Sequence, residues 1–163
     1  MRVERQYALL IEPLLAQAAA YARSILRDRQ NAQDAVQEAA MRGLERFGTF
    51  DSSRPFKGWW FAIVRNCCID ILRQASAAKT RDLDEQVLAH PPSPDTADWE
   101  TLAAAMDSLA DHHREILRLR YFADLNYREL SEALAIPQGT VMSRLHLARK
   151  SLQARMGGSE ETE

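Results

Sequence analysis

The chain has 163 residues, 46% of them hydrophobic, so it can bury a core in one domain or in two small ones. By our reading of the sequence no apolar run is long enough for a membrane span, and the start MRVERQYALLIEP carries two acids and no small-residue cleavage site. We therefore expect neither membrane insertion nor a signal peptide. The two cysteines, Cys67 and Cys68, are adjacent, which excludes a disulfide framework and a Cys-rich zinc site. Buried thiols in a reducing cytoplasm are the expectation.

The net charge of −2 conceals an uneven distribution. Residues 54–81 carry six Lys or Arg side chains against the single acid Asp70, and residues 138–156 carry four with no acid. The stretch 82–111 holds eight acids and no Lys or Arg. Phosphate affinity depends on local positive charge, so two separated basic faces favour two contacts on one extended polyanion.

Scarce glycine and the lack of strand-like alternation predict an all-α chain. A first helix is predicted over 4–26, with a kink at Pro13. A second runs from an N-cap at Asn31 to about Phe47, and a third covers about 56–74. The inner stripe of the first helix is predicted to be Leu9, Leu10, Leu14, Ala18, Tyr21, Ala22 and Ile25.

The amino-acid composition changes after the third predicted helix, where a run of acidic residues precedes HisProProSerProAsp. Such a composition is typical of a flexible linker. We therefore predict two small helical domains joined by an acidic linker and followed by a disordered tail. In order, the first domain, the linker, the second domain and the tail are 1–75, 76–96, 97–156 and 157–163.

In the second domain, helices over 97–109 and 111–122 are expected to precede a helix-turn-helix over 127–150. In the latter, Ile136 would plug the turn, and Pro137 suits the first position of a new helix. Three residues of the second helix recur at helical spacing and should face inward: Val141, Leu145 and Ala148.

The other side of that helix offers hydrogen-bond donors, and no acid lies between Pro137 and Gly158. This pattern is typical of a recognition helix that enters a DNA major groove. The alternative is an ordinary amphipathic hairpin with a solvated basic face. The donors are Thr140, Ser143, Arg144, His146, Arg149 and Lys150.

The stretch 50–74, FDSSRPFKGWWFAIVRNCCIDILRQ, interleaves aromatic and basic residues. Single-stranded nucleic acid needs such a mixture, because rings stack on bases while cations hold phosphates. The alternative is that the tryptophans belong to the core. At least one of Trp59 and Trp60 should, since adjacent positions cannot share a helix face.

Catalysis has little support. His112 and His113 are adjacent and lack the i, i+4 spacing of helical metal ligands, and the chain has neither a glycine-rich phosphate loop nor a nucleophile elbow. We expect no catalytic residue, no metal and no cofactor.

Three strings resemble extracytoplasmic-function sigma factors, the minimal members of the sigma-70 family, over roughly 18–74 and 98–153. NAQDAVQEAAMRGLERF is similar to the helix that docks on core RNA polymerase. RPFKGWWFAIVRNCCIDILR is similar to the segment that melts and reads the −10 element. LADHHREILRLRYFADLNYRELSEALAIPQGTVMSRLHLARKSL is similar to the −35-reading domain.

The resemblance implies three partners: core RNA polymerase, promoter DNA and an anti-sigma factor. It implies polymerase contacts by Asp34, Gln37, Glu38 and Arg42. It implies a flipped −10 base held by the loop at 50–58, with −10 contacts from Arg54, Lys57, Trp59, Trp60, Arg65, Asn66, Asp70 and Arg73. It places in or beside the −35 duplex Thr140, Met142, Ser143, Arg144, His146, Leu147, Arg149 and Lys150.

Some positions depart from the family pattern. Met142 and Leu147 stand where basic residues are common, and could meet a thymine methyl instead. Ser131 and Ala135 replace the commoner Ala and Gly of the turn, and Trp60 replaces Leu. The alternative function is a helix-turn-helix repressor or activator that binds duplex DNA alone, but such a protein does not need a melting segment beside a docking helix. A sigma-like module that only sequesters a regulator is a third interpretation.

Overall fold

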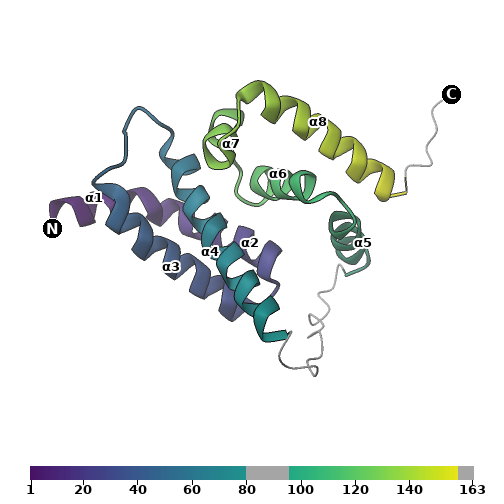
Figure 1. The fold of residues 1–163 in the computed structure, drawn as a ribbon, viewed down its shortest axis with the longest axis horizontal. Coiled ribbons are helices and arrows are strands. Elements are labelled where there is room, and N and C mark those ends of the chain that lie inside the picture. Colours follow the sequence, from purple (N-terminus) through teal and green to yellow (C-terminus); the bar gives the residue numbers. More distant parts are fainter. Residues whose placement is uncertain (80–95, 158–163) are drawn as a thin grey trace.

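The computed structural model describes the backbone of residues 1–79 and 96–157, and the side chains of 1–78 and 101–157. The regular structure of these residues is helical, which confirms the all-α prediction (Figure 1). Most of the predicted linker and nearly all of the predicted tail lie outside the described residues. The elements are α1 (Arg2–Ile11), the 3₁₀ helix η1 (Glu12–Leu14), α2 (Leu15–Leu26), α3 (Arg29–Phe47), α4 (Phe56–Lys79), α5 (Thr96–Asp107), α6 (Asp111–Tyr121), α7 (Tyr127–Leu134) and α8 (Gln138–Arg155).

Pro13 interrupts the first predicted helix, which becomes α1, η1 and α2. A 3₁₀ turn has 3.0 residues per turn instead of 3.6, so it rotates the buried stripe. Tyr7 and Ile11 face the core before it, whereas Leu9 and Leu10 are exposed, and the prediction that those two leucines lie inside was wrong.

The stretch Arg2–Leu26 is also long and apolar enough to cross a membrane, by length and composition only. The expectation that no apolar run is long enough to span a membrane is therefore corrected for this stretch. Ala18, Tyr21 and Ala22 of this stretch are buried, and α2 packs against α3 and α4. Core helices of ordinary domains pass the same test, so the stretch is weak evidence for a span.

Local residues set where α3 and α4 begin. Asp28, not Asn31, is the N-cap of α3, because its carboxylate accepts a hydrogen bond from the Asn31 backbone N–H at 3.0 Å. Helix α4 begins at Phe56 as predicted and continues past the predicted end to Lys79.

The first unit, α1–α4, closes around a hydrogen-bonded aromatic centre. Trp60 Nε1 donates to Tyr7 Oη at 3.0 Å, and Tyr7 Oη donates to the Ala40 carbonyl at 2.9 Å. Gly43 makes room for this arrangement, since a Cβ there would lie 3.2 Å from Trp60 Cδ1 and closer still to the Tyr7 ring. Both polar atoms of this centre are therefore satisfied.

The second unit, α5–α8, contains the predicted helix-turn-helix. Asn126 caps α7 by accepting from the Glu129 N–H at 2.8 Å. Ala135 ends α7 in the left-handed conformation, with φ 53° and ψ 45°, and Ser131 Oγ donates to the Ile136 carbonyl at 2.5 Å. Pro137 is the N-cap of α8, one position earlier than predicted. A side chain thus ties the turn that the sequence had marked only by its small residues.

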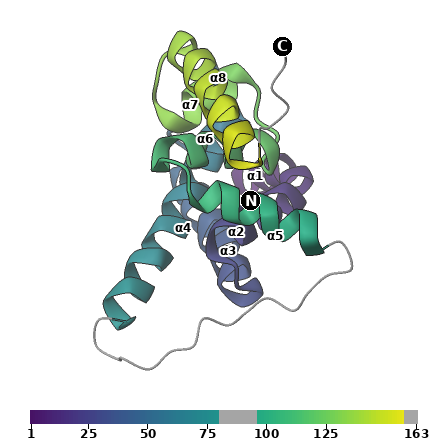
Figure 2. The same ribbon diagram turned by 90° about the vertical axis from the view of Figure 1, so that its right-hand side faces the viewer.

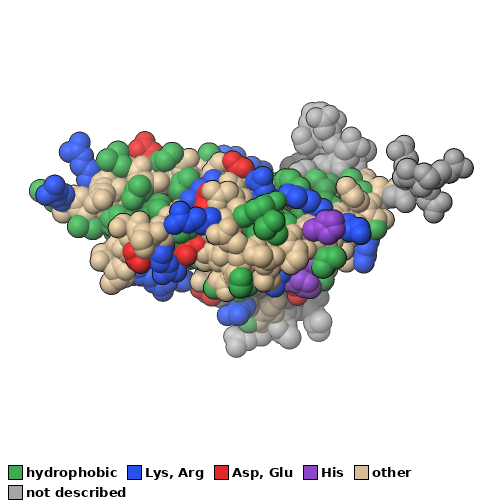
Figure 3. Space-filling model, turned by 90° about the horizontal axis from the view of Figure 1, so that it is seen from above, with side chains coloured by type: hydrophobic (Ala, Val, Ile, Leu, Met, Phe, Trp, Pro, Cys, Tyr) green, Lys and Arg blue, Asp and Glu red, His purple; other side chains and the backbone are tan. Residues whose placement is uncertain are grey.

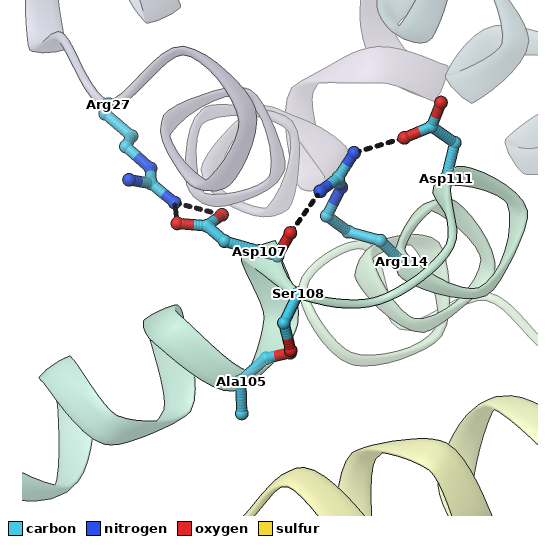
Figure 4. A network of polar contacts seen from close by, with 6 residues as sticks. All are labelled: Arg27, Ala105, Asp107, Ser108, Asp111 and Arg114. Carbon is cyan, nitrogen blue, oxygen red and sulfur yellow. Dashed lines mark hydrogen bonds and ion pairs between the residues drawn. The ribbon is translucent and has the colours of Figure 1, made fainter.

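The two units pack against each other. Helix α7 lies against α4, and α6 contacts α2 (Figures 1 and 2). At the edge of the interface, Arg27 at the end of α2 pairs with Asp107 of α5, and the Asp107 carbonyl accepts from Arg114 of α6 at 3.0 Å (Figure 4). The sequence predicted two helical units but not their arrangement.

Candidate nucleic-acid interface

The outer face of α8 is open. Val141, Leu145 and Ala148 are buried, as their helical spacing predicts, while Met142 and Leu147 keep 55% and 53% of their surface exposed. Seen from above, the molecule shows Lys, Arg and His side chains beside hydrophobic ones (Figure 3). The other predicted members of the outer face are half-buried or exposed: Thr140, Ser143, Arg144, His146, Arg149 and Lys150.

Arg149 is anchored by an aromatic hydroxyl. Its Nε donates to Tyr121 Oη at 3.1 Å, and this bond raises the pKa of the guanidinium above its usual value. Tyr121 ends α6 and is 58% exposed. Sequence reasoning missed Tyr121, because helical periodicity cannot reveal a contact with a distant helix. The bond holds the Arg149 guanidinium beside Tyr121 at the end of α6.

Arg144 lies near a histidine pair. The rings of His112 and His113 are 4.2 Å apart. Desolvation lowers the pKa of His113, and the charges of His112 and Arg144 lower it further. Among the residues whose placement is described, no three His, Cys, Asp or Glu side chains are grouped to hold a metal ion.

A second candidate surface forms where the loop after α3 leads into α4. The Phe50 ring lies 4.8 Å from Trp59 and 5.5 Å from Phe56, and stacks on Phe47 at 6.2 Å. An open hollow beside these rings is lined by Phe47, Phe50 and Phe56 together with Arg54. This loop-to-helix surface therefore combines rings and a cation, as residues 50–74 predicted.

The loop is shaped by Asp51. Its Oδ1 accepts from the Ser53 backbone N–H at 2.9 Å and from Ser53 Oγ at 2.7 Å. These hydrogen bonds hold the pKa of Asp51 below its usual value. The Asp-Ser-Ser run of the sequence is thus a turn that presents the aromatic rings.

Trp60 does not belong to this surface. It has no exposed area, and its N–H is used by Tyr7. Trp59 is half-buried and belongs to the ring cluster. The prediction that at least one tryptophan is core is confirmed, and the assignment of Trp60 to DNA contact is corrected to a structural role.

Three predicted −10 cations contact the second unit. Arg54 pairs with Glu132 of α7, and Arg65 pairs with Glu115 of α6. Lys57 Nζ donates to the Asp124 carbonyl at 2.9 Å. We call this contact zone the α4–α7 seam; it comprises Arg54, Lys57, Gly58, Arg65, Glu115, Asp124, Glu129 and Glu132. No local signal in the sequence indicates these pairings.

Arg42 links the predicted polymerase-facing residues to the predicted −10 residues. Its Nε lies 2.7 Å from Glu38 Oε1, and its Nη1 lies 2.9 Å from Asp70 Oδ2. The hydrogen bond to Asp70, followed by that to Glu38, raises the pKa of the guanidinium. Asp34 and Gln37 are exposed on the same helix, α3. The structure therefore joins two surfaces that the sequence treated separately.

The remaining predicted −10 residues, Asn66 and Arg73, are exposed on α4. Asn66 Oδ1 accepts from Arg65 Nη1 at 3.4 Å. Cys67 and Cys68 beside them are buried and free. Burial raises the pKa of both thiols, that of Cys68 to about 12, so they are neutral at physiological pH.

Sequence profiles of known families match both units. The profile described as Sigma-70 region 2 matches residues 10–78, and the profile of Sigma-70 region 4 matches residues 105–154. The first match spans the loop-to-helix surface, and the second spans the helix-turn-helix.

Characterised relatives resemble most of the chain. The ECF RNA polymerase sigma factor SigM of Bacillus subtilis is 32% identical over 136 residues, which cover 80% of this chain and 83% of SigM. SigW of the same organism is 30% identical over 147 residues, covering 81% and 79%. SigL of Mycobacterium tuberculosis is 30% identical over 139 residues, covering 82% and 78%.

Solved structures share the arrangement of the helices. The sigma factor RpoE from Bartonella quintana, in complex with the anti-sigma factor NepR, matches with a TM-score of 0.70 and 25% identity over 96% of this chain and 98% of RpoE. CnrH in complex with the cytosolic domain of CnrY matches in fold with a TM-score of 0.71, at 22% identity, over 96% and 90%. With both regions matched and SigM similar over most of its length, this chain belongs to the ECF RNA polymerase sigma factors of the sigma-70 family.

Proposed function

We propose that the chain is a non-enzymatic specificity subunit that binds core RNA polymerase in the cytoplasm and directs initiation at particular promoters. In this proposal α8 reads the −35 duplex, and the loop-to-helix surface captures the melted −10 strand. The observation that carries the proposal is two separate cationic surfaces of different chemistry in one chain. One mixes cations with flexible apolar side chains, and the other mixes cations with rings.

The −35 assignment rests on the open face of α8. Arginine can bond two acceptors of guanine in the major groove, and apolar side chains contact the thymine methyl. Arg149, directed by Tyr121, suits the first role, and exposed Met142 and Leu147 suit the second. A promoter element with both guanine and thymine would match this face.

The −10 assignment rests on the hollow lined by Phe47, Phe50 and Phe56. A base taken out of the stack can lie on such rings, while Arg54 and Lys57 bind the adjoining phosphates. Trp59, at the edge of the cluster, offers a further ring. Trp60 takes no part, because it is buried.

The docking assignment rests on α3. Asp34 and Glu38 are four positions apart, so they lie on one helix face and can meet a basic partner together. Gln37 adds an exposed amide beside them. An anti-sigma factor is a further proposed partner, since the similar RpoE structure was solved in complex with the anti-sigma factor NepR.

The test is a titration of purified core polymerase with the Asp34→Lys/Glu38→Lys double variant, followed by transcription from a promoter library. We expect affinity to fall at least tenfold, the equivalent of about 1.4 kcal/mol, because two acids become cations on the docking face. The double variant Glu4→Lys/Glu12→Lys makes the same charge change on exposed α1–η1 residues and should bind normally. Unchanged affinity of the α3 variant, with its helical circular dichroism intact, would refute docking through this face.

A further inference from the structure

Helix α1 forms a second wall of the hollow beside the aromatic rings. Three residues of this helix line the hollow, Val3, Gln6 and Leu10. They are spaced by three and four positions, so they lie on one face of the helix. The hollow has a volume of about 560 Å³, which is within the range of sites that hold small organic groups. The loop-to-helix surface therefore faces a wall that comes from the start of the chain.

Tyr7 fixes this wall against the rings. Helix α1 packs on α3 (Figure 1), and the centroid of the Tyr7 ring lies 5.4 Å from that of Phe47 and 6.4 Å from that of Phe56. Tyr7 Oη donates to the Ala40 carbonyl at 2.9 Å, and Tyr7 is 3% exposed. Gln6, the preceding residue, therefore has a defined backbone position relative to the rings that line the hollow.

The two walls suit the two faces of a planar base. Val3 and Leu10 are large apolar residues that keep 49% and 37% of their surface exposed, and phenylalanine rings lie on the other side. A base taken out of its stack can pack between apolar and aromatic side chains. Such packing contributes affinity but little discrimination, because every base has a π face. Discrimination between bases requires hydrogen bonds to the base edge.

Gln6 is the side chain of the hollow best suited to make these hydrogen bonds. Among the described residues that line the hollow, the other polar side chains are Ser52 and Arg54. Arg54 has only donors and pairs with Glu132, and Ser52 offers a single hydroxyl. The Gln6 amide is exposed and presents an acceptor beside two donors. This pattern allows the bidentate contact that glutamine makes with a base such as adenine.

We infer that α1 belongs to the −10 base site and that Gln6 reads the edge of the extruded base. The inference rests on the proposed role of the loop-to-helix surface and adds the residue that sets its base preference. The rings hold the base by its face, and the Gln6 amide donates to and accepts from its edge. An apolar strip on α1 alone would fit many partners. The amide between Val3 and Leu10, opposite the rings and a cation, favours a base.

The test is a selection from a promoter library randomised over the −10 element, made with the full chain bound to core polymerase. Gln6→Ala removes the side chain, whereas Gln6→Met keeps its length and lacks the amide. We expect both variants to flatten the preference at one position, with the ratio of the best to the worst base reduced about five- to tenfold, because a bidentate contact is lost. Preferences at the other −10 positions and at the −35 element should remain.

Gln33→Ala is the matched control. It removes the same amide from an exposed position of α3 that does not line the hollow. This variant should keep the parental preference at every −10 position. Circular dichroism should show the parental helicity for all three variants, since substitutions at exposed positions have small effects on stability.

If Gln6→Ala keeps the parental ratio at every −10 position, the inference is refuted. A preference that is lost in Gln6→Ala but retained in Gln6→Met would also overturn it, since the bulk of the side chain rather than the amide would then select the base. A loss of promoter strength shared equally by all sequences would overturn it as well, because Gln6 would contribute no discrimination.

The parental chain separates these outcomes from failure of the proposed function. If the parent with core polymerase shows no −10 preference, the proposed −10 role of the loop-to-helix surface is refuted. If the parent shows a preference that survives in both Gln6 variants, only the role of Gln6 is refuted.

Discussion

Helices α4 and α8 both carry cations over a buried apolar stripe, yet the structure treats them differently. The outer face of α8 is open, whereas α4 packs against α7, and Arg65 of α4 pairs with Glu115 of α6. The cores beneath them differ as well. In α4, Trp60 donates a hydrogen bond to Tyr7 and Phe61 packs edge-on against Tyr21, whereas α8 packs through Val141, Leu145 and Ala148.

This difference shows that amphipathic spacing determines which side of a helix is buried in its own unit, but not which outer side chains remain free. On α8 the side chains that helical spacing places outside are also free of the other unit. On α4 the outer cations are engaged by a second unit whose position depends on non-local packing. A basic helix in a sequence therefore indicates a capacity to bind phosphate rather than an available site.

The largest effect that we expect concerns the aromatic centre. Trp60→Ala should destabilise the fold by about 3–5 kcal/mol, because it leaves a cavity and removes the hydrogen bond to Tyr7. Leu145→Ala, in the aliphatic core of the other unit, should cost about 2–5 kcal/mol. Urea unfolding followed by circular dichroism measures both.

Trp60→Phe is the matched control, since it keeps an aromatic ring and loses only the donor and part of the volume. It should fall between the parent and Trp60→Ala. A loss below about 0.5 kcal/mol for Trp60→Ala, the range of surface substitutions, would place this ring outside the core and break the contrast between the two tryptophans.

An intermediate effect is expected on the open face. Arg149→Ala should cost about 1–3 kcal/mol at the preferred −35 sequence and relax the preference at one base pair, whereas Arg144→Ala should weaken all sequences alike. The tyrosine-directed Arg149 suits a base edge, and Arg144 sits nearer the edge of the face. Selection from a promoter library decides, and two variants with the parental −35 preference and strength would contradict reading by α8.

Tyr121→Phe extends the same experiment, because it removes only the hydroxyl that directs Arg149. We expect a weaker form of the Arg149→Ala phenotype at the same base pair, of about 0.5–1.5 kcal/mol, the usual value of one hydrogen bond. In the Arg149→Ala background, Tyr121→Phe should have no further effect on base preference.

The smallest effect concerns the turn between α7 and α8. Ala135 has φ 53°, a conformation that disfavours a side chain by about 1–2 kcal/mol, so Ala135→Gly should relieve strain. The greater entropy of unfolded glycine offsets about 0.5–1 kcal/mol of this. We expect a net gain of about 0.5–1 kcal/mol in thermal unfolding. Ala154→Gly, on an exposed position inside α8, should have the opposite sign.

Much of the fold could be predicted because its determinants are local. Phe56 as the start of α4, the break at Pro13 and the turn before α8 each follow from residues within a few positions. The inward stripe of α8 follows from spacing alone. The helix-turn-helix of the second unit and the family could therefore be predicted from the sequence.

The errors arise where geometry accumulates along the chain or contacts are distant. Leu9 and Leu10 were misplaced because η1 rotates the helix face that precedes it. Asp28 rather than Asn31 caps α3, since both residue types suit the position and only the backbone decides. The Tyr121–Arg149 bond and the α4–α7 seam join segments that no short pattern connects.

Arg42 couples the two tasks that we propose for the first unit, polymerase docking and −10 DNA contact. One guanidinium bonds Glu38 of α3 and Asp70 of α4, so it joins the helix that we propose for docking to the helix that we propose for −10 DNA. A polymerase surface that binds Glu38 would compete with Arg42 for this carboxylate, and Arg42 also bonds Asp70. We therefore expect polymerase binding at α3 to change the orientation of α4 through Arg42, and with it the angle at which α4 meets DNA.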